Sequence, residues 1–525
     1  MRARLLLAGV LLLALALRLY QLDFGLPSLN DPDEPVFVMT ALDMLREGRL
    51  NPGWFGHPAT LLFYLLALIA AGVAAVGLAA GSWTDTSGFA QAVFADPGTV
   101  VLPMRVLSAL LGTLSVWLTW RLGRSVAGPR AGLIAALLLA VCALHVDYSQ
   151  VVRTDMLATV LMTGSLLHAL SIARGGSVQD HLLAGIAAGL ACATKWPAVL
   201  VLVAPAAATL WRLHDDRRAW RWLPVAPLLA AVTLVVTSPY LLLDWPVVLR
   251  DLGGEARPVH LGATGFGLVG NLGWYLGHPL RESFGIAGLA LLTIGCAAVW
   301  RQRAAAVVLL PTAAVLLLAL AAQALVWARW MVPLLPIAAV LVALGIETVA
   351  RGHRIAVPAV ALLLAGTMGR EALAHVAART DDPRQAASAW VLANLPPGRT
   401  LLVEHAAFDL LRYQGRLLFP MGSAGCIDVR AALRRAPSHA SVNQARTGRA
   451  IVDLGNVAPD RLSTCHADYA VLSNVARYRV EARKFTQQNI VYQRYLTRYV
   501  RVAAFTRGEL NIEVYERSSV ARAER

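Results

Sequence analysis

Three carboxylates lie close together in the stretch LNDPDEPVF, residues 29–37, in the first loop after an apolar segment. Asp31, Asp33 and Glu34 fall within four residues, and Pro32 and Pro35 restrict the backbone around them. Carboxylates this close repel one another, so they could bind a cation or provide a general base that accepts a proton. The alternative is a solvated acidic loop in which Asp31 or Asp33 caps the next helix.

A second group of ionisable residues lies between two apolar segments, in HVDYSQVVRTD, residues 145–155. Asp147, Arg153 and Asp155 stand at the edge of a hydrophobic environment, where charged side chains are costly and usually face a cavity or a partner. A surface ion pair of Arg153 with either aspartate is the alternative. His145 lies two residues before Asp147, but we find no full zinc-binding pattern.

Lys195, in ATKWP, is the only lysine before residue 484 of an arginine-rich chain. A compact ammonium group at the end of an apolar segment suits a phosphate ligand. The alternative is a side chain that reaches the membrane interface without binding anything. Further polar residues that could pair locally or bind a ligand are His57, Arg105, His260, His278 and Arg329.

Helices that span a membrane must position these residues. The chain has 525 residues, 57% of them hydrophobic and only 15% charged, whereas soluble proteins carry about 25% charged residues. Apolar runs long enough to span a bilayer recur until about residue 370. The first, Leu5 to Leu17, follows Arg2 and Arg4 without a convincing cleavage site, so we interpret it as a retained transmembrane helix.

Arginines in alternate gaps between the apolar runs predict the topology. The net charge is +15, and the clusters lie at residues 121–130, 174, 212–221, 301–303 and 351–354. The positive-inside rule places these clusters in the cytoplasm. Residues 145–155, Lys195, residues 244–282, Arg329 and the chain after residue 371 are then outside. We exclude nucleic-acid binding because no basic stripe is interleaved with aromatic residues.

The apolar stretch 58–80 does not fit this alternation, because the loops 23–57 and 81–99 on either side of it are both predicted outside. Gly72 and Gly77 interrupt it. We therefore expect a segment that does not cross the membrane: a re-entrant, broken or interfacial one. The alternative is that the positive-inside rule fails at one loop.

The composition changes after Gly369, so residues 372–525 are predicted to form a small soluble α/β domain. Ser388 to Leu395 is typical of a helix that ends at Pro396-Pro397-Gly398. Strands are predicted at Thr400–Val403, Tyr469–Leu472 and Ile512–Tyr515. Of the five cysteines, three lie in apolar helices, and only Cys426 and Cys465 could pair.

Several segments, taken in order, resemble one family of membrane enzymes. They are DPDEPVF (31–37), GHPATLLFYLLAL (56–68), LPMRVLSALLGTLSVWLTWRLGRSVAG (102–128), DYSQVVRTDMLATVLM (147–162), GLACATKWPAVLVL (189–202) and RWMVPLLP (329–336). The ordered set resembles the GT-C glycosyltransferases. Within them it is similar to the branch of protein O-mannosyltransferases and bacterial lipid A aminoarabinose transferases.

The resemblance implies a mostly α fold: a GT-C bundle of about 11–13 membrane helices over residues 1–371, with the α/β domain after it. It implies an inverting glycosyltransferase that moves a hexose or pentose from a polyprenyl-phosphate donor to a lipid, polysaccharide or protein acceptor. Asp33 best matches the general base, with Glu34 and Asp31 beside it. Residues matched to substrate binding are Asp155, Arg153, Lys195, Arg105, His57 and Arg329, although His57-Pro58-Ala59 departs from many relatives.

The resemblance makes no cofactor certain and leaves a divalent metal possible. A polytopic transporter is disfavoured because we find no internal repeat and the ionisable groups fall at helix ends on one side. A non-catalytic cell-envelope assembly protein would leave the first-loop acids without a purpose. The preference for Arg over Lys suggests a GC-rich bacterial genome, which predicts a plasma-membrane protein with an extracytoplasmic C-terminal domain.

Overall fold

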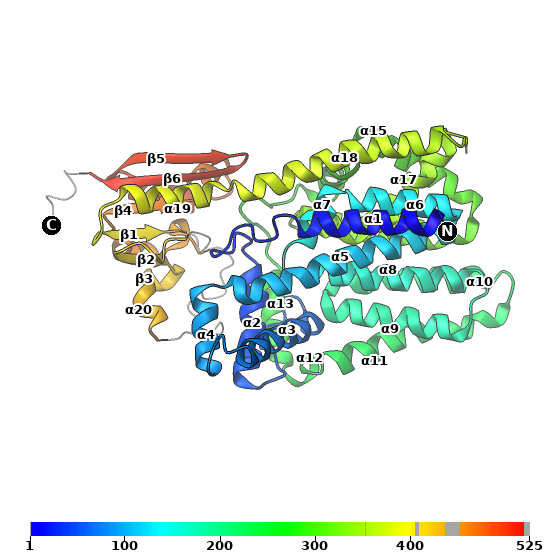
Figure 1. Cartoon of the computed structure of the whole chain (residues 1–525), viewed down its shortest axis with the longest axis horizontal. Helices are drawn as coiled ribbons and strands as arrows, with labels where there is room; N and C mark the ends of the chain where they lie inside the picture. Colours follow the sequence, from blue (N-terminus) through cyan, green and yellow to red (C-terminus); the bar gives the residue numbers. More distant parts are fainter. Residues whose placement is uncertain (1, 352, 405–408, 436–451, 519–525) are drawn as a thin grey trace.

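A bundle of long helices makes up most of the molecule, and the C-terminal domain lies at one end of it, opposite the N-terminus (Figure 1). The computed structural model describes residues 2–351, 353–404, 409–435 and 452–518. The bundle helices are α1 (Arg2–Leu19), α5 (Gly98–Ala127), α6 (Pro129–Ala140), α8 (Thr154–Ala173), α9 (Val178–Thr194), α10 (Val203–Arg212), α11 (Val225–Thr237), α15 (Arg281–Ala298), α16 (Arg303–Ala321), α17 (Leu335–Val349) and α18 (Ala356–Thr380).

Shorter elements connect these helices, many of them at the end of the bundle near the C-terminal domain. The α-helices are α2 (Glu34–Glu47), α3 (Thr60–Ala79), α4 (Thr86–Ala95), α7 (Ala143–Ser149), α12 (Tyr240–Leu243), α13 (Trp245–Glu255) and α14 (Gly267–Tyr275). The 3-10 helices are η1 (Trp196–Leu202), η2 (Arg217–Trp222), η4 (Val299–Arg301) and η5 (Ala328–Leu334), and η3 (Leu276–Leu280) is a short π-helix.

The predicted bundle of membrane helices with a small C-terminal α/β domain is confirmed. Within the described residues, eight helical segments are long and apolar enough to cross a membrane, or nine if the bent pair α6–α7 is one span. The expected number was about 11–13. Two further bundle helices fall outside this count, since α1 carries three arginines and α9 has only 17 residues, although both run along the bundle in Figure 1.

Glycines allow two bundle helices to touch backbone to backbone. A Cβ added at Gly295 of α15 would lie 1.8 Å from the carbonyl oxygen of Leu341, and one at Gly345 of α17 would lie 2.0 Å from that of Leu291. Small residues at helix crossings permit this close approach where lipid supplies no hydrophobic driving force. The contact fixes α15 against α17, one of the most buried helices of the bundle.

The stretch 58–80 contains one unbroken helix, α3 (Thr60–Ala79), which is long and apolar enough to cross a membrane. The expectation of a broken segment is therefore wrong, whereas the re-entrant one stays a prediction. Apolar residues with high helix propensity continue through Gly72 and Gly77, and neither glycine has a positive φ angle. In Figure 1, α2 runs across the direction of the bundle and α3 lies oblique to it. The interfacial alternative remains a prediction.

The C-terminal domain is built on a six-stranded mixed sheet of order β3-β2-β1-β4-β6-β5. Its strands are β1 (Thr400–Val403), β2 (Arg416–Pro420), β3 (Cys426–Asp428), β4 (Tyr469–Leu472), β5 (Tyr499–Arg507) and β6 (Leu510–Arg517). The helices and turns are α19 (Pro383–Asn394), η6 (Gly422–Ala424), α20 (Val429–Leu433), η7 (Leu454–Asn456), η8 (Pro459–Cys465), α22 (Val475–Val480) and α23 (Thr486–Leu496).

Successive side chains of β1 point to opposite faces of the sheet and so contribute to two separate layers of the domain core. Leu401 and Val403 face α19, whereas Leu402 packs with the layer that contains α23 and η7. This is the period-2 pattern of a sheet covered on both faces. α18 continues past residue 371 to Thr380, and α19 begins at Pro383, so the helices place the join between the two parts at residues 381–382.

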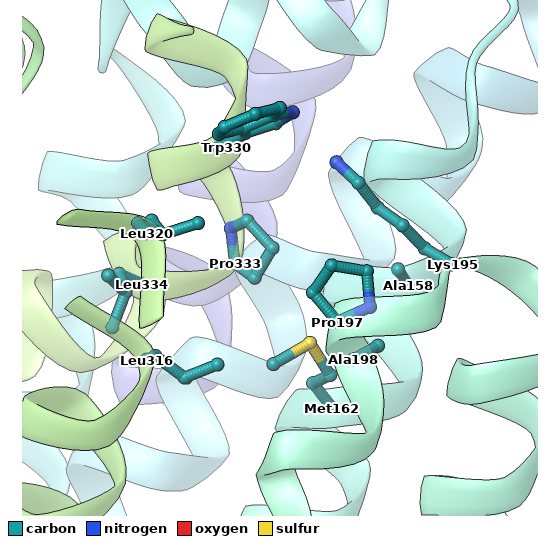
Figure 2. A pocket seen from close by; sticks show the side chains of 10 residues that line it. All are labelled: Ala158, Met162, Lys195, Pro197, Ala198, Leu316, Leu320, Trp330, Pro333 and Leu334. Carbon is teal, nitrogen blue, oxygen red and sulfur yellow. The ribbon is translucent and has the colours of Figure 1, made fainter. Parts of the chain in front are cut away.

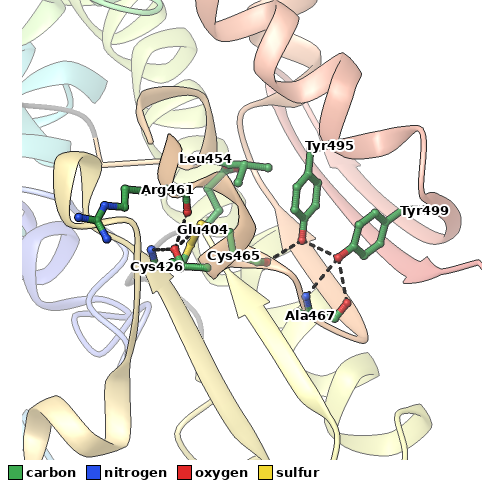
Figure 3. The surroundings of a disulfide bond; sticks show 9 residues. Glu404, Cys426, Leu454, Arg461, Cys465, Ala467, Tyr495 and Tyr499 are labelled. Carbon is green, nitrogen blue, oxygen red and sulfur yellow. Dashed lines mark hydrogen bonds between the residues drawn. A yellow bond between two sulfur atoms is a disulfide. The ribbon is translucent and has the colours of Figure 1, made fainter. Parts of the chain in front are cut away.

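The disulfide Cys426–Cys465 joins β3 to η8, which confirms that these two cysteines pair. Beside it, the Tyr495 hydroxyl lies within hydrogen-bond distance of two acceptors, the carbonyl oxygen of Cys465 (3.0 Å) and the hydroxyl of Tyr499 (2.9 Å). Tyr499 in turn donates to the carbonyl oxygen of Ala467 (2.9 Å). Figure 3 shows this chain of contacts, which ties β3, η8 and β4 to the end of α23.

Candidate active site

The acidic turn is shaped by Asp31 and leads into α2. One Asp31 oxygen accepts hydrogen bonds from the backbone N–H groups of Asp33 (3.0 Å) and Glu34 (3.3 Å). Pro35 occupies the first turn of α2, where its missing N–H costs nothing. Asp33 is the N-cap residue by position but makes no side-chain capping hydrogen bond. Its carboxylate is therefore not consumed by the helix end.

Arg153 joins the two aspartates of the turn. Its guanidinium contacts Asp31 (Nη2–Oδ1, 2.7 Å) and Asp33 (Nη1–Oδ2, 2.5 Å), and its side chain is only 5% exposed. The ring of Tyr148 packs against it, 5.9 Å from the guanidinium carbon. A guanidinium thus holds the place between two carboxylates where a metal ion could bind. Among the described residues, no three His, Cys, Asp or Glu side chains are grouped to hold a metal.

Glu34 and Arg105 form a fully buried ion pair behind the turn. The pair is bidentate (2.9 and 2.6 Å), and a third hydrogen bond reaches Glu34 from the backbone N–H of Val152 (2.9 Å). Arg105 also donates to the carbonyl oxygens of Leu22 and Phe24. Both side chains are 0% exposed. The structure therefore places these two residues behind the turn, where they hold it, and not on its open side.

Asp33 is the accessible carboxylate of the turn, with 37% of its side chain exposed against 16% for Asp31. Arg329, in η5, reaches it from another part of the chain (Nη2–Oδ2, 3.5 Å) and also packs over the ring of Trp327. Burial alone would raise the pKa of Asp33, but the positive charges of Arg153 and Arg329 lower it below its ordinary value. Asp33 is therefore ionised at neutral pH.

Lys195 and Asp155 form a second buried ion pair at the ends of two bundle helices. The distance between Lys195 Nζ and Asp155 Oδ1 is 2.5 Å, and the side chains are 7% and 2% exposed. Burial lowers the pKa of Lys195 below its ordinary value, although Asp155 opposes this shift. Arg329 and Arg153 also act on the charge of Asp155. The acidic turn with its two arginines and the pair Lys195–Asp155 thus belong to one electrostatic environment.

His57 lies between the two clusters. Burial, together with the positive charges of Lys195 and Arg329, lowers its pKa to about 3, so its ring is neutral at physiological pH. The ring stacks on Trp54 at a centroid distance of 5.8 Å. Two residues on, the N–H of Ala59 bonds to the carbonyl oxygen of Thr194 (3.2 Å), which holds this loop beside Lys195.

An apolar cavity adjoins Lys195. Its walls come from η5, α8, α16 and η1, and Figure 2 shows Lys195 extending toward Trp330 at one end, with Met162 and Leu316 at the other. Lys195 is the one charged side chain among the ten residues that line it. A ligand with an anionic group and an apolar tail would match this distribution of polarity.

Other predicted residues lie in structural contacts. In the bundle core Arg18 donates a hydrogen bond to His145 Nδ1 (2.7 Å), and Asp147 pairs with Arg379 and His375 of α18. His260 packs against Trp327, and His278 lies 3.8 Å from Glu282 on an exposed helix face. None of these contacts includes the acidic turn.

No local sequence pattern singles out Tyr148, Glu255 or Asn30, which the structure brings beside the site. Burial raises the pKa of Glu255, and the charge of Asp33 raises it further. A Cβ added at Gly56, in the first external loop, would lie 3.1 Å from the Oε1 atom of Glu255. The wide sequence separation between Glu255 and the first loop explains why no local pattern reveals this contact.

Part of the chain matches a known family model. Residues 88–243 match the family model described as dolichyl-phosphate-mannose-protein mannosyltransferase. This region includes Arg105, Arg153, Asp155 and Lys195 but not the acidic turn or Arg329. No curated protein matches the chain by sequence.

Solved structures show that the fold is shared over the whole chain. ArnT from Cupriavidus metallidurans in the apo state is 15% identical, with a TM-score of 0.58 and 98% of each chain covered. The same protein bound to undecaprenyl phosphate is 15% identical, with a TM-score of 0.54 and the same coverage. The archaeal oligosaccharyltransferase AglB from Archaeoglobus fulgidus, in complex with an inhibitory peptide and a dolichol-phosphate, is 13% identical, with a TM-score of 0.51, 99% of this chain and 74% of that chain covered.

Proposed function

Because the family match and the shared fold together indicate a GT-C glycosyltransferase of the branch that contains ArnT and the protein mannosyltransferases, we propose that this chain transfers a hexose or pentose from a polyprenyl-phosphate donor to an acceptor hydroxyl. The observation that supports this most is the position of Asp33, an accessible carboxylate next to Arg329. The neighbouring Lys195 lines an apolar cavity.

Asp33 acts as the general base in this proposal. The acceptor hydroxyl gives its proton to the Asp33 carboxylate while its oxygen attacks the anomeric carbon of the sugar. The bond between that carbon and the phosphate oxygen breaks, and its electron pair leaves with the polyprenyl phosphate. A single displacement of this kind inverts the anomeric centre.

Lys195 and Arg329 bind the phosphate of the donor. Both are cations with little exposure, and charge-assisted hydrogen bonds from such groups stabilise the charge that develops on the leaving phosphate. A bound phosphate also offsets the positive charge near Asp33, which makes Asp33 a stronger base when the donor is present. The isoprenoid tail packs against the apolar side chains that line the cavity beside Lys195, where each buried CH₂ contributes about 0.8 kcal/mol.

Asp31, Arg153, Glu34 and Arg105 position the base. Asp31 fixes the backbone of the turn, Arg153 orients both aspartates, and the buried pair Glu34–Arg105 anchors the start of α2. These contacts hold the base within a few tenths of an ångström of the position that the reaction requires. The acceptor, whether lipid, polysaccharide or protein, reaches Asp33 from the exposed side of the turn.

The reaction takes place on the extracytoplasmic face of a bacterial plasma membrane in this proposal. A disulfide in the C-terminal domain is typical of an oxidising compartment. The loop between α10 and α11, which holds three arginines, lies at the opposite end of the bundle (Figure 1). Positive loops on the cytoplasmic side agree with this orientation.

Transfer of a labelled sugar tests the proposal. Purified protein in detergent is incubated with undecaprenyl phosphates that carry radiolabelled hexoses or pentoses, together with lipid, polysaccharide and protein fractions of a bacterial envelope. We expect one donor to be consumed and its sugar to appear in one fraction. Asp33→Asn should lower the transfer rate by about 10²–10⁴-fold, the usual contribution of a general base.

Asp23→Asn is the matched control, because Asp23 is an exposed carboxylate of the same loop. It should transfer sugar at the rate of the unchanged protein. Full activity of Asp33→Asn would show that Asp33 is not the base. Consumption of none of the donors, by a protein that remains folded, would favour a transporter or an assembly protein instead.

A further inference from the structure

The residue that precedes the acidic turn is held by the C-terminal domain. Asn30 is 6% exposed, and its side-chain amide donates a hydrogen bond to Asp382 Oδ2 (3.0 Å). Its amide oxygen accepts one from Gln385 Nε2 (3.0 Å), and its backbone carbonyl accepts one from Arg384 Nη1 (2.9 Å). All three of these hydrogen bonds thus join Asn30 to residues at the start of α19.

On the α19 side of this contact, Asp382 and Arg384 also bond to each other. Asp382 caps the helix by accepting a hydrogen bond from the backbone N–H of Arg384 (2.8 Å), and it also pairs with the guanidinium of Arg384 (2.6 Å). Asp382 is 6% exposed. A buried network in which every member has a partner fixes its geometry more strongly than separate surface contacts do.

On its other side, Asn30 is enclosed by the loop that leads into the turn. Gly25 has a φ angle of +66°, and a Cβ added there would lie 2.6 Å from Asn30 Cγ. Only glycine fits this position without displacing Asn30. The next residue is Asp31, which holds the N–H groups of Asp33 and Glu34 and pairs with Arg153. A short path of contacts therefore runs from α19 to the proposed base.

We infer that Asn30, with Asp382, Arg384 and Gln385, forms a positioning link through which the C-terminal domain fixes the acidic turn of the active site. The inference rests on the proposed function, because the link matters for transfer only if Asp33 is the base. It assigns the C-terminal domain a part in catalysis without any contact of that domain with the reacting atoms.

Another contact between the two parts of the chain provides a matched control. Arg507 of β5 pairs with Asp381, and it donates a hydrogen bond to the Asp381 carbonyl oxygen (2.8 Å). The Asp381 side chain is 84% exposed, and this contact does not include Asn30. Arg507→Ala thus removes a contact at the same junction but leaves the link to the turn intact.

Hydrogen exchange of residues 29–37 tests the link independently of activity. Asn30→Ala and Gln385→Ala should each speed amide exchange in this segment by about tenfold or more, because local opening becomes easier. Arg507→Ala should leave it unchanged. Unchanged exchange in both link variants would overturn the inference, whether or not the chain proves to be a glycosyltransferase.

Kinetics with the donor that the unchanged protein consumes test the catalytic consequence. We expect Asn30→Ala to lower kcat by roughly 10²-fold, as a small displacement of a catalytic group does, with KM for the donor within about twofold. The groups that face Asp33 are Arg153, Arg329, His57, Asp31 and Glu255. Since the turn would move away from its two arginines, the acid limb of kcat/KM should shift to higher pH.

A purely structural role would give a different result. In that case Asn30→Ala would lower the thermal midpoint and the amount of folded protein, with kcat per folded molecule and the pH profile unchanged. That outcome would contradict the link. Arg507→Ala should keep the kcat and the pH profile of the unchanged protein, even if its thermal midpoint falls.

Discussion

Asp33 differs from the two carboxylates beside it in what its oxygens contact. Asp31 holds two backbone N–H groups and Arg153, and both oxygens of Glu34 bind Arg105. Asp33 binds arginines through one oxygen, Oδ2, and keeps more than a third of its side chain exposed. Three acids of the same turn thus have different environments, and the environment distinguishes the proposed base from the two carboxylates beside it.

The pH profile should report the low pKa of Asp33. Because Arg153 and Arg329 hold this pKa below its ordinary value, the carboxylate stays ionised as the pH falls, and only protonation would remove the base. We expect kcat/KM, which reports the free enzyme, to show no acid limb from Asp33 between about pH 8 and pH 4, whereas a carboxylate with the ordinary pKa of about 3.9 would be nearly half protonated at the lower limit. His57, with a pKa of about 3, adds none in that range.

Arg329→Gln checks the sign of this effect. With one of the two cations gone, the pKa of Asp33 rises and the acid limb moves to higher pH. The measurement is the pH dependence of kcat/KM for both proteins. A limb at the same pH in both would mean that Arg329 does not act on the base.

The pair Lys195–Asp155 should separate stability from donor binding. Lys195→Met leaves the buried carboxylate of Asp155 without its partner, which costs about 3–5 kcal/mol of unfolding free energy. Lys195→Met with Asp155→Leu should recover much of that loss. Both variants should bind undecaprenyl phosphate at least about tenfold more weakly, because the charged contact to the phosphate is gone.

Thermal unfolding in detergent and binding of undecaprenyl phosphate measure the two effects. If the double variant recovered both stability and affinity, Lys195 would be a structural residue only.

At the scale of elements, the start of α2 depends on a buried ion pair. Glu34→Gln leaves the fully buried Arg105 without a counter-charge, so we expect a loss of about 3–5 kcal/mol in unfolding free energy. Glu47→Gln is a control on the same helix, since Glu47 forms an exposed pair with Arg46 and should change stability by less than about 1 kcal/mol. Equal losses in the two variants would contradict the anchoring role of Glu34.

The elements also show how far local sequence patterns reach. The strands Thr400–Val403 and Tyr469–Leu472 have the predicted bounds, because short apolar runs between turn residues define a buried strand. β2, β3 and β5 were not predicted, since β5 is largely exposed and β3 has only three residues. The predicted helix at 388–395 begins five residues earlier, at Pro383, where Asp382 supplies the cap.

The site residues were predictable as types but not as partners. Spacing alone singled out Asp31, Asp33, Arg153, Asp155 and Lys195. It could not show that Arg153 binds the acidic turn and not Asp155, because Arg153 and Asp33 are 120 residues apart in sequence. Asn30 was missed for the same reason: its partners Asp382, Arg384 and Gln385 lie more than 350 residues later.

At the scale of the molecule, the C-terminal domain and the arginine-rich loops should lie on opposite sides of the membrane. A membrane-impermeant maleimide added to intact bacterial cells should label Cys426 and Cys465 only after reduction and unfolding of the domain. A cysteine introduced at Asp215, in the loop between α10 and α11, should react only in lysed cells. Labelling of the introduced cysteine from outside would reverse the orientation.

The disulfide closes a loop of the C-terminal domain, since Cys426 and Cys465 are 39 residues apart in sequence. Cys426→Ser with Cys465→Ser should therefore lower the unfolding free energy of the C-terminal domain by about 2–4 kcal/mol. Differential scanning fluorimetry with and without reductant measures this. A reductant that shifts the unchanged protein but not the double variant would confirm that the bond is the cause.

The anomeric configuration of the transferred sugar tests the central claim most directly. A donor of known configuration is consumed by the purified protein, and the product is read from the coupling of its anomeric proton by nuclear magnetic resonance. An acceptor oxygen activated by Asp33 displaces the phosphate in one step, so the account predicts an inverted centre. A retained configuration would require two displacements with a covalent sugar–enzyme intermediate, and would contradict the role of Asp33 as base.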